Sequence, residues 1–179
     1  MIAADAQAEV YGVRKNGESV EYRGCVYGRS RSFEVGFIEE CIGGGACGGT
    51  RNVTLAGALV ARERFVASQV LGTKWIIEVE DLRNGHVLHK VPTGTSESGD
   101  PKIIGAGLTS AIVVKSDGAV AWIDENLVAA GLQYEVHVLD RSGERLLASG
   151  TDIAPRSLAL AGSTLYWTQG GKPYSTTLN

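Results

Sequence analysis

Short stretches in which apolar and polar residues alternate recur along this chain. They include residues 53–61 (VTLAGALVA), 113–122 (VVKSDGAVAW) and 158–167 (LALAGSTLYW). Successive side chains of a β-strand point to opposite faces, so this alternation predicts half-buried strands. The best helical pattern, residues 127–132 (LVAAGL), is too short and is interrupted by Gly131. The pattern therefore predicts an all-β fold.

Three glycines mark the turn of a hairpin that recurs three times. Gly57, Gly118 and Gly162 each lie between an alternating strand and a second apolar strand. Glycine suits such turns because it adopts positive φ without a Cβ clash. These stretches therefore predict three similar hairpins.

A second hairpin follows the first two, in residues 76–88 (IIEVEDLRNGHVL) and 136–146 (VHVLDRSGERL). A two-residue type I′ turn needs positive φ at both central residues, which favours glycine preceded by a small polar residue. We therefore expect two-residue turns at Asn84-Gly85 and Ser142-Gly143. The two hairpins together form a unit of four antiparallel strands.

This unit recurs at a spacing of 61 residues from Gly57 to Gly118, and of 58 from Gly85 to Gly143. The spacing falls to 44 residues from Gly118 to Gly162. Four antiparallel strands per repeat of about 40–50 residues, with insertions, are typical of a β-propeller blade. A single blade leaves its faces exposed, so blades must stack around an axis.

Shorter units precede and follow these repeats. The first contains strand-like residues 9–15, 20–27 and 32–37, and the last, residues 157–179, has three strands. Two short end units are expected where the ends of the chain share a blade and close the ring. The sequence thus predicts a small β-propeller-like fold of about four blades, in one domain over residues 9–179. The alternatives are a Greek-key sandwich or barrel, and a half-ring completed by a second copy.

Residues 1–8 precede this domain. They lack the basic and long apolar regions of an intact signal peptide, but Ala6-Gln7-Ala8 has the small-x-small form of a signal-peptidase cut. We expect either a disordered start or the remnant of a removed signal. The second interpretation predicts an extracytoplasmic or secreted protein.

The final segment, IAPRSLALAGSTLYWTQGGKPYSTTL, resembles the ends of small propeller-like proteins exported by high-GC Gram-positive bacteria. YRGCVYG, LAGALVA, EVEDLRNG and AVAWI fit the same pattern. The resemblance covers the chain from about Glu9 onward. Its motifs are turns and core positions, so it implies a fold and not a chemistry.

Composition and charge exclude several classes of protein. The chain has 179 residues, of which 44% are hydrophobic and 21% charged, and its formal net charge is −3. These values exclude a disordered chain, and they argue against nucleic-acid binding, which needs a basic surplus. No apolar run approaches the roughly 18 residues of a membrane span. The expected partner is a protein or a glycan.

Three cysteines are present: Cys25, Cys41 and Cys47. The glycines of CIGGGAC allow Cys41 and Cys47 to approach each other, so we expect a disulfide between them. Pairing of Cys25 with either of them is the competing arrangement. Three cysteines without a nearby histidine argue against zinc.

No catalytic, cofactor-binding or metal-binding motif is found in the sequence. His86, His89 and His137 are expected to be solvated strand residues, and Glu78 and Glu80 to share a solvated strand face. The chain contains no HExxH, GxSxG or P-loop sequence.

The candidate ligand contacts are Trp75, Asp124 and Glu125. Trp75 follows polar Gly-Thr-Lys and is expected at a strand entry, partly exposed, where its ring could contact a sugar or a partner. The two acids are expected at a hairpin tip. The sequence thus favours a non-catalytic binding or scaffold module that contacts protein or cell-wall glycan. The alternatives are a lyase or hydrolase with its site at the channel mouth, and a self-assembling homo-oligomer.

Overall fold

The computed structural model of the protein describes residues 1–15, 19–38, 47–68, 72–96, 108–128 and 131–179. These residues form β-strands and no helix, so the predicted all-β class is confirmed. No helix that could cross a membrane is found among them. The strands are β1 Ala3–Ala4, β2 Ala8–Lys15, β3 Ser19–Val26, β4 Ser32–Ile38, β5 Cys47–Ala56, β6 Leu59–Ser68, β7 Gly72–Asp81, β8 His86–Ser96, β9 Leu108–Val114, β10 Val120–Val128, β11 Gly131–Asp140, β12 Gly143–Gly150, β13 Ala159–Ala161, β14 Thr164–Gln169 and β15 Lys172–Thr177.

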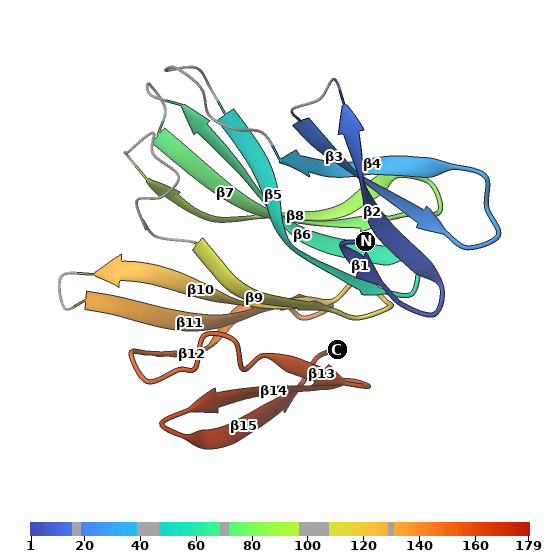
Figure 1. The fold of residues 1–179 in the computed structure, drawn as a ribbon. Helices are drawn as coiled ribbons and strands as arrows, with labels where there is room; N and C mark the ends of the chain where they lie inside the picture. The colour runs from blue at the N-terminus through green and yellow to red at the C-terminus, as the bar shows by residue number, and fades with distance from the viewer. Residues whose placement is uncertain (16–18, 39–46, 69–71, 97–107, 129–130) are drawn as a thin grey trace.

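The strands form three antiparallel sheets, and neighbouring strands in each sheet are consecutive in the sequence (Figure 1). The sheets contain β1–β8, β9–β12 and β13–β15. Within the first sheet, β4 and β5 are joined by a single residue pair, Ile38 with Gly49. The chain is therefore organised as successive groups of four, four, four and three strands, and none of the sheets closes on itself.

Apolar clusters join each group of strands to the next. Val10, Tyr22 and Val35 of the first group pack with Val60 and Leu82 of the second. The second group packs against β9–β10 through a cluster that includes Ile77, Val79 and Trp122. The β9–β12 sheet packs against β13–β15 through Val138, Leu165, Leu178 and Trp167.

The first strands of successive groups also contact one another. β1 contacts β5, β5 contacts β9, and β9 contacts β13. Trp122 and Trp167 are both buried, with 1% and 7% of their surface exposed. The groups are thus stacked in the order of the sequence.

The three hairpins predicted at Gly57, Gly118 and Gly162 are present, and each glycine has positive φ. The two-residue turn predicted at Asn84-Gly85 is wrong. The hairpin pairs Asp81 with His86, so the loop has four residues, and Gly85 alone in it has positive φ, 75°. The amides of Asn84 and Gly85 both donate to the Asp81 carbonyl, which closes this longer turn.

The second predicted two-residue turn is displaced by one residue. Asp140 pairs with Gly143, so the loop is Arg141-Ser142 rather than Ser142-Gly143. Gly143 has φ of 93°, and the Asp140 carboxylate accepts a hydrogen bond from the Ser142 amide at 2.8 Å. This side-chain contact stabilises a turn that starts at the aspartate.

The ends of the chain do not pair with each other, which contradicts the expected closure. β1 pairs with β2, and β15 is an edge strand that pairs with β14. Near the start of the chain, Asp5 joins the first strands to the turn after β5. Asp5 accepts hydrogen bonds from the amides of Gln7, Ala8 and Gly57, and Ala8 is fully buried.

Candidate functional site

Asp124 and Glu125 are neighbours on β10 and lie in different environments. Successive strand side chains point to opposite faces, so only Asp124 enters the interface between β5–β8 and β9–β12. Asp124 is 3% exposed, whereas Glu125 is half-buried. Burial raises the pKa of Glu125, although the charges of Arg156 and Arg51 oppose the shift.

Asp124 is held by neutral donors rather than by a cation. Trp122 Nε1 donates to Oδ2 at 2.8 Å and Thr109 Oγ1 donates to Oδ1 at 3.2 Å. A β-bulge opposite Ile123 and Asp124 shifts the register of β9 and pairs Thr109 with Asp124. Burial raises the pKa of Asp124 to about 7, because these hydrogen bonds only partly offset the lost hydration.

Glu63 on β6 is a second buried carboxylate in the same interface. It is fully buried, and its Oε1 accepts the Thr109 amide at 2.8 Å. Arg51 Nε lies 3.4 Å from Oε2. Burial raises the pKa of Glu63, with the charge of Arg51 opposing the shift. Thr109 therefore bridges the two carboxylates through its amide and its hydroxyl.

A strained residue on β5 adds to this cluster. Asn52 has φ of 51°, which is uncommon for a residue with a Cβ, and it lies where the pairing of β5 with β6 shifts register. Its amide Nδ2 donates to the Thr109 carbonyl at 2.5 Å. The guanidinium of the preceding Arg51 lies over the Phe65 ring, 5.4 Å from its centre. The irregular strand thus directs polar groups from β5 toward β9.

His137 completes the cluster from β11. Its ring stacks on Trp122 at 5.3 Å between centres, and Nε2 lies 3.2 Å from Glu135 Oε2 and 4.0 Å from Asp124 Oδ2. The side chain is 18% exposed, so the expectation of a solvated histidine is wrong here. His86 is exposed, as expected. The imidazole connects the buried acid to the molecular surface.

Trp75 is not partly exposed as the sequence suggested. It is fully buried, and it lies on the face of β7 that also carries Ile77 and Val79, which pack against β9–β10. Its indole Nε1 has no hydrogen-bond partner among the described residues. A sugar or partner could not contact this ring without rearrangement, so the ligand contact proposed for Trp75 lacks the exposed face it needs.

The pair Glu78 and Glu80 forms a buried network rather than a solvated face. Both residues are 3% exposed, as is Arg62, whose Nη2 lies 2.9 Å from Glu78 and 2.7 Å from Glu80. Lys90 Nζ contacts Glu78 at 3.1 Å. Burial opposes ionisation of Glu78, but the surrounding cations outweigh it and lower its pKa. Burial raises the pKa of Glu80 despite Arg62.

The predicted disulfide falls mostly outside the described residues. Cys41 and the side chain of Cys47 are not among them. Cys25 is a free thiol, which contradicts its competing pairing. Its Sγ lies 3.7 Å from Glu9 Oε1, and burial together with this carboxylate raises the pKa of the thiol. A thiol with a raised pKa is a weak nucleophile at neutral pH.

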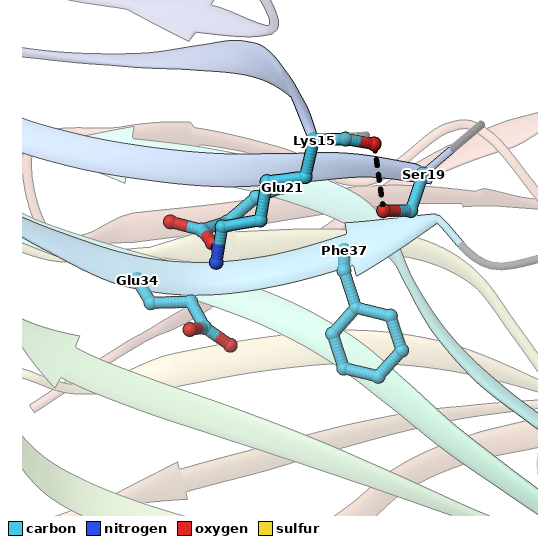
Figure 2. Close-up of a pocket in the computed structure, with 5 residues that line it drawn as sticks. All are labelled: Lys15, Ser19, Glu21, Glu34 and Phe37. Atoms are coloured by element: carbon cyan, nitrogen blue, oxygen red, sulfur yellow. Dashed lines mark hydrogen bonds and ion pairs between the residues drawn. The ribbon is translucent and has the colours of Figure 1, made fainter. Parts of the chain in front are cut away.

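A second candidate site is a surface hollow of about 200 Å³ on β2–β4. Lys15, Ser19, Glu21, Glu34 and Phe37 line it (Figure 2). Lys15 forms an ion pair with Glu21, and Arg23 contacts the same carboxylate at 2.5 Å. The hydrogen bonds from these two cations lower the pKa of Glu21.

No group of three His, Cys, Asp or Glu side chains in the described parts of the chain could hold a metal ion. The sequence analysis missed Glu63, Thr109 and His137 as members of the buried cluster. A signal for Glu63 was available, since the residues that alternate with it on one face of β6 are apolar: Leu59, Ala61, Phe65 and Ala67.

The raised pKa of Asp124 predicts a pH-dependent stability. Its folded pKa of about 7 lies above the ordinary 3.8, so the folded chain retains a proton that the unfolded chain has released between these values. The resulting stabilisation is complete below pH 4 and is lost as the pH rises through 7. We expect Asp124→Asn to raise the free energy of unfolding at pH 8 by about 1–2 kcal/mol.

Urea unfolding of both proteins at pH 4.5 and pH 8 measures this effect. The advantage of Asp124→Asn should be larger at pH 8, because the amide keeps an acceptor for Trp122 and carries no charge. An effect of the same size at both pH values would show that Asp124 does not change its protonation between them, and that its pKa is not raised to about 7. At each pH, the wild-type free energy of unfolding is subtracted from that of the variant, which removes the contributions of the other acids.

Searches of protein-family models, of curated proteins and of solved structures found no match to this chain.

Proposed function

We propose that the protein is a non-catalytic binding module with an extracytoplasmic location and a β-propeller-like arrangement of about four blades. The successive groups of antiparallel strands support the arrangement, as do the contacts between their first strands. The three-stranded last group is the incomplete blade. Stacked sheets provide a rigid scaffold on which exposed side chains hold a ligand.

The hollow in Figure 2 is the observation that carries this proposal. It combines a partly exposed aromatic ring, Phe37, with the charged groups of Lys15, Glu21 and Glu34 and the hydroxyl of Ser19. A sugar presents an apolar ring face and several hydroxyls, which match an aromatic ring and hydrogen-bonding carboxylates. We therefore assign a glycan, stacked on Phe37, as the ligand.

The test is titration with a soluble oligosaccharide of β-1,4-linked N-acetylglucosamine, followed by calorimetry. Phe37→Ala should weaken binding roughly tenfold, because the stacking surface is lost. Glu34→Gln should also weaken binding. Glu34 is exposed and has no ion pair with another described residue, so this variant should fold normally.

Tyr166→Ala is the matched control, since this tyrosine is 41% exposed on β14 in a different sheet. It should bind like the wild type. The proposal fails if the wild type gives no saturable heat with the oligosaccharide, or if Phe37→Ala and Tyr166→Ala bind equally well. Thermal melting of each variant separates a binding defect from a folding defect.

The second candidate function is acid–base catalysis by a lyase or hydrolase. The buried Asp124, with a pKa of about 7 and His137 at 4.0 Å, favours this function because such an acid can exchange protons near neutral pH. This function is the second candidate because Asp124 is almost completely buried. Mass spectrometry of the incubated oligosaccharide distinguishes the candidates. Shortened products that disappear with Asp124→Asn would identify an enzyme, and an intact oligosaccharide supports a binding module.

A further inference from the structure

A larger hollow of about 350 Å³ lies at the opposite end of β3 from the Phe37 hollow. It is formed by the turn after β3 and the turn after β7, which come from different strand groups. Arg29, Ser30 and Arg31 contribute from the first turn, Arg83 from the second, and Phe33 from the start of β4. The hollow is thus built by two turns that the fold brings together.

The charge of this hollow is strongly positive. Three guanidinium groups line it, although the chain as a whole has a net charge of −3. The neighbouring acid is Asp81, which Arg83 binds through Nε at 2.8 and 3.0 Å and through Nη2 at 2.8 Å. One carboxylate leaves two positive charges uncompensated. An anion would therefore be attracted to the hollow.

The arginines differ in how firmly they are held. The contacts with Asp81 fix Arg83, and Arg29 Nη1 donates to the Arg83 carbonyl at 3.3 Å. Arg31 is exposed and forms no hydrogen bond or ion pair with another described residue. Its five N–H donors are therefore available to a ligand. Two positioned guanidinium groups and one available group form a partly preorganised receptor.

We propose that this hollow binds a phosphate or sulfate monoester that carries a small apolar group. Guanidinium groups match tetrahedral oxyanions because they donate two parallel hydrogen bonds. The oxyanion would lie on Arg31 beside Arg29 and Arg83, with the Ser30 hydroxyl as a further donor. The apolar group of the ester would lie against the half-buried Phe33 ring. This ligand class is independent of the glycan assigned to the Phe37 hollow.

Calorimetric titration at low ionic strength with phenyl phosphate, phenyl sulfate and inorganic phosphate tests the proposal. We expect saturable binding of at least one ester, with the ester bound more tightly than inorganic phosphate because of Phe33. The comparison of the two esters identifies which oxyanion the hollow prefers. Binding should weaken as salt is added, since the contacts are between charges.

Arg31→Gln should weaken ester binding about tenfold or more, because charge-assisted hydrogen bonds are lost. It should melt like the wild type. Arg141→Gln is the matched control, since it removes the same charge from an exposed arginine in the β11–β12 turn. This control should bind the ester normally.

Three results would overturn the proposal: no saturable binding of either ester, equal weakening by Arg31→Gln and Arg141→Gln, or loss of ester binding in Phe37→Ala. The third result would place the ester in the other hollow. Phe37→Ala with normal ester binding and no oligosaccharide binding would separate the two sites. If the glycan proposal fails, the ester proposal can still be tested. If the ester proposal fails, the glycan proposal can still be tested.

Discussion

Gly85→Val is expected to lower the free energy of unfolding by about 3 kcal/mol or more. Two costs combine at this position. Gly85 has φ of 75°, a conformation that a β-branched residue adopts only with strain. A Cβ at Gly85 would also lie 2.5 Å from Phe33 Cδ1, so the ring that packs between the first two strand groups would have to move.

Gly143→Val separates these two costs. Gly143 has φ of 93°, but a Cβ there would have no heavy atom within 4 Å. This control should therefore lose only the conformational part, roughly 1–2 kcal/mol. Chemical denaturation of both variants measures the difference. Equal losses at the two glycines would show that Phe33 does not pack against the β7–β8 turn.

This comparison also shows what the sequence could predict about the turns. Asn84-Gly85 correctly marked the end of a hairpin, because the need for positive φ at Gly85 is a local property of the chain. The sequence could not predict the loop length. That length depends on Asp81, whose carbonyl accepts two backbone amides and whose carboxylate binds Arg83. A turn with these side-chain contacts extends to four residues.

The burial of charged side chains was also difficult to predict from the sequence. Alternation along β6 and β7 identifies which side chains share a face, but the second face of a sheet is solvated only if nothing covers it. Here successive strand groups cover both faces of the second group, so Glu63 and Glu78 are buried on opposite sides. Stacking of strand groups is a non-local property, which alternation within a strand does not report.

The candidate site depends on the same non-local packing. The sequence predicted Asp124 at a hairpin tip, and this is wrong, because Asp124 lies inside β10 and pairs with Thr109 of β9 and Glu135 of β11. Its raised pKa depends on Trp122, on Thr109 and on the sheet that seals the interface. Trp75 was wrongly predicted to be partly exposed. Polar neighbours suggested exposure, but Trp75 is fully buried on the face of β7 that packs against β9–β10 through Ile77 and Val79.

Removal of residues 175–179 is expected to lower the free energy of unfolding by more than about 4 kcal/mol. The deletion removes half of β15 and also Leu178, which is fully buried against the β9–β12 sheet. The Leu178 amide donates to the Ser163 carbonyl at 2.8 Å, and its carbonyl accepts a hydrogen bond from Lys115 Nζ at 3.0 Å. The chain end is therefore held by packing and by hydrogen bonds.

This loss would occur without any closure of a ring, since β15 pairs with β14 and not with the start of the chain. Leu178→Ala in the full-length chain identifies the cause, because it keeps the backbone pairing of β15 and removes only the buried side chain. We expect it to account for about 3 kcal/mol of the loss. Deletion of the exposed Asn179 alone should cost less than about 1 kcal/mol. If Leu178→Ala is neutral and the truncated chain still unfolds early, pairing of β15, rather than burial of the leucine, stabilises the last group of strands.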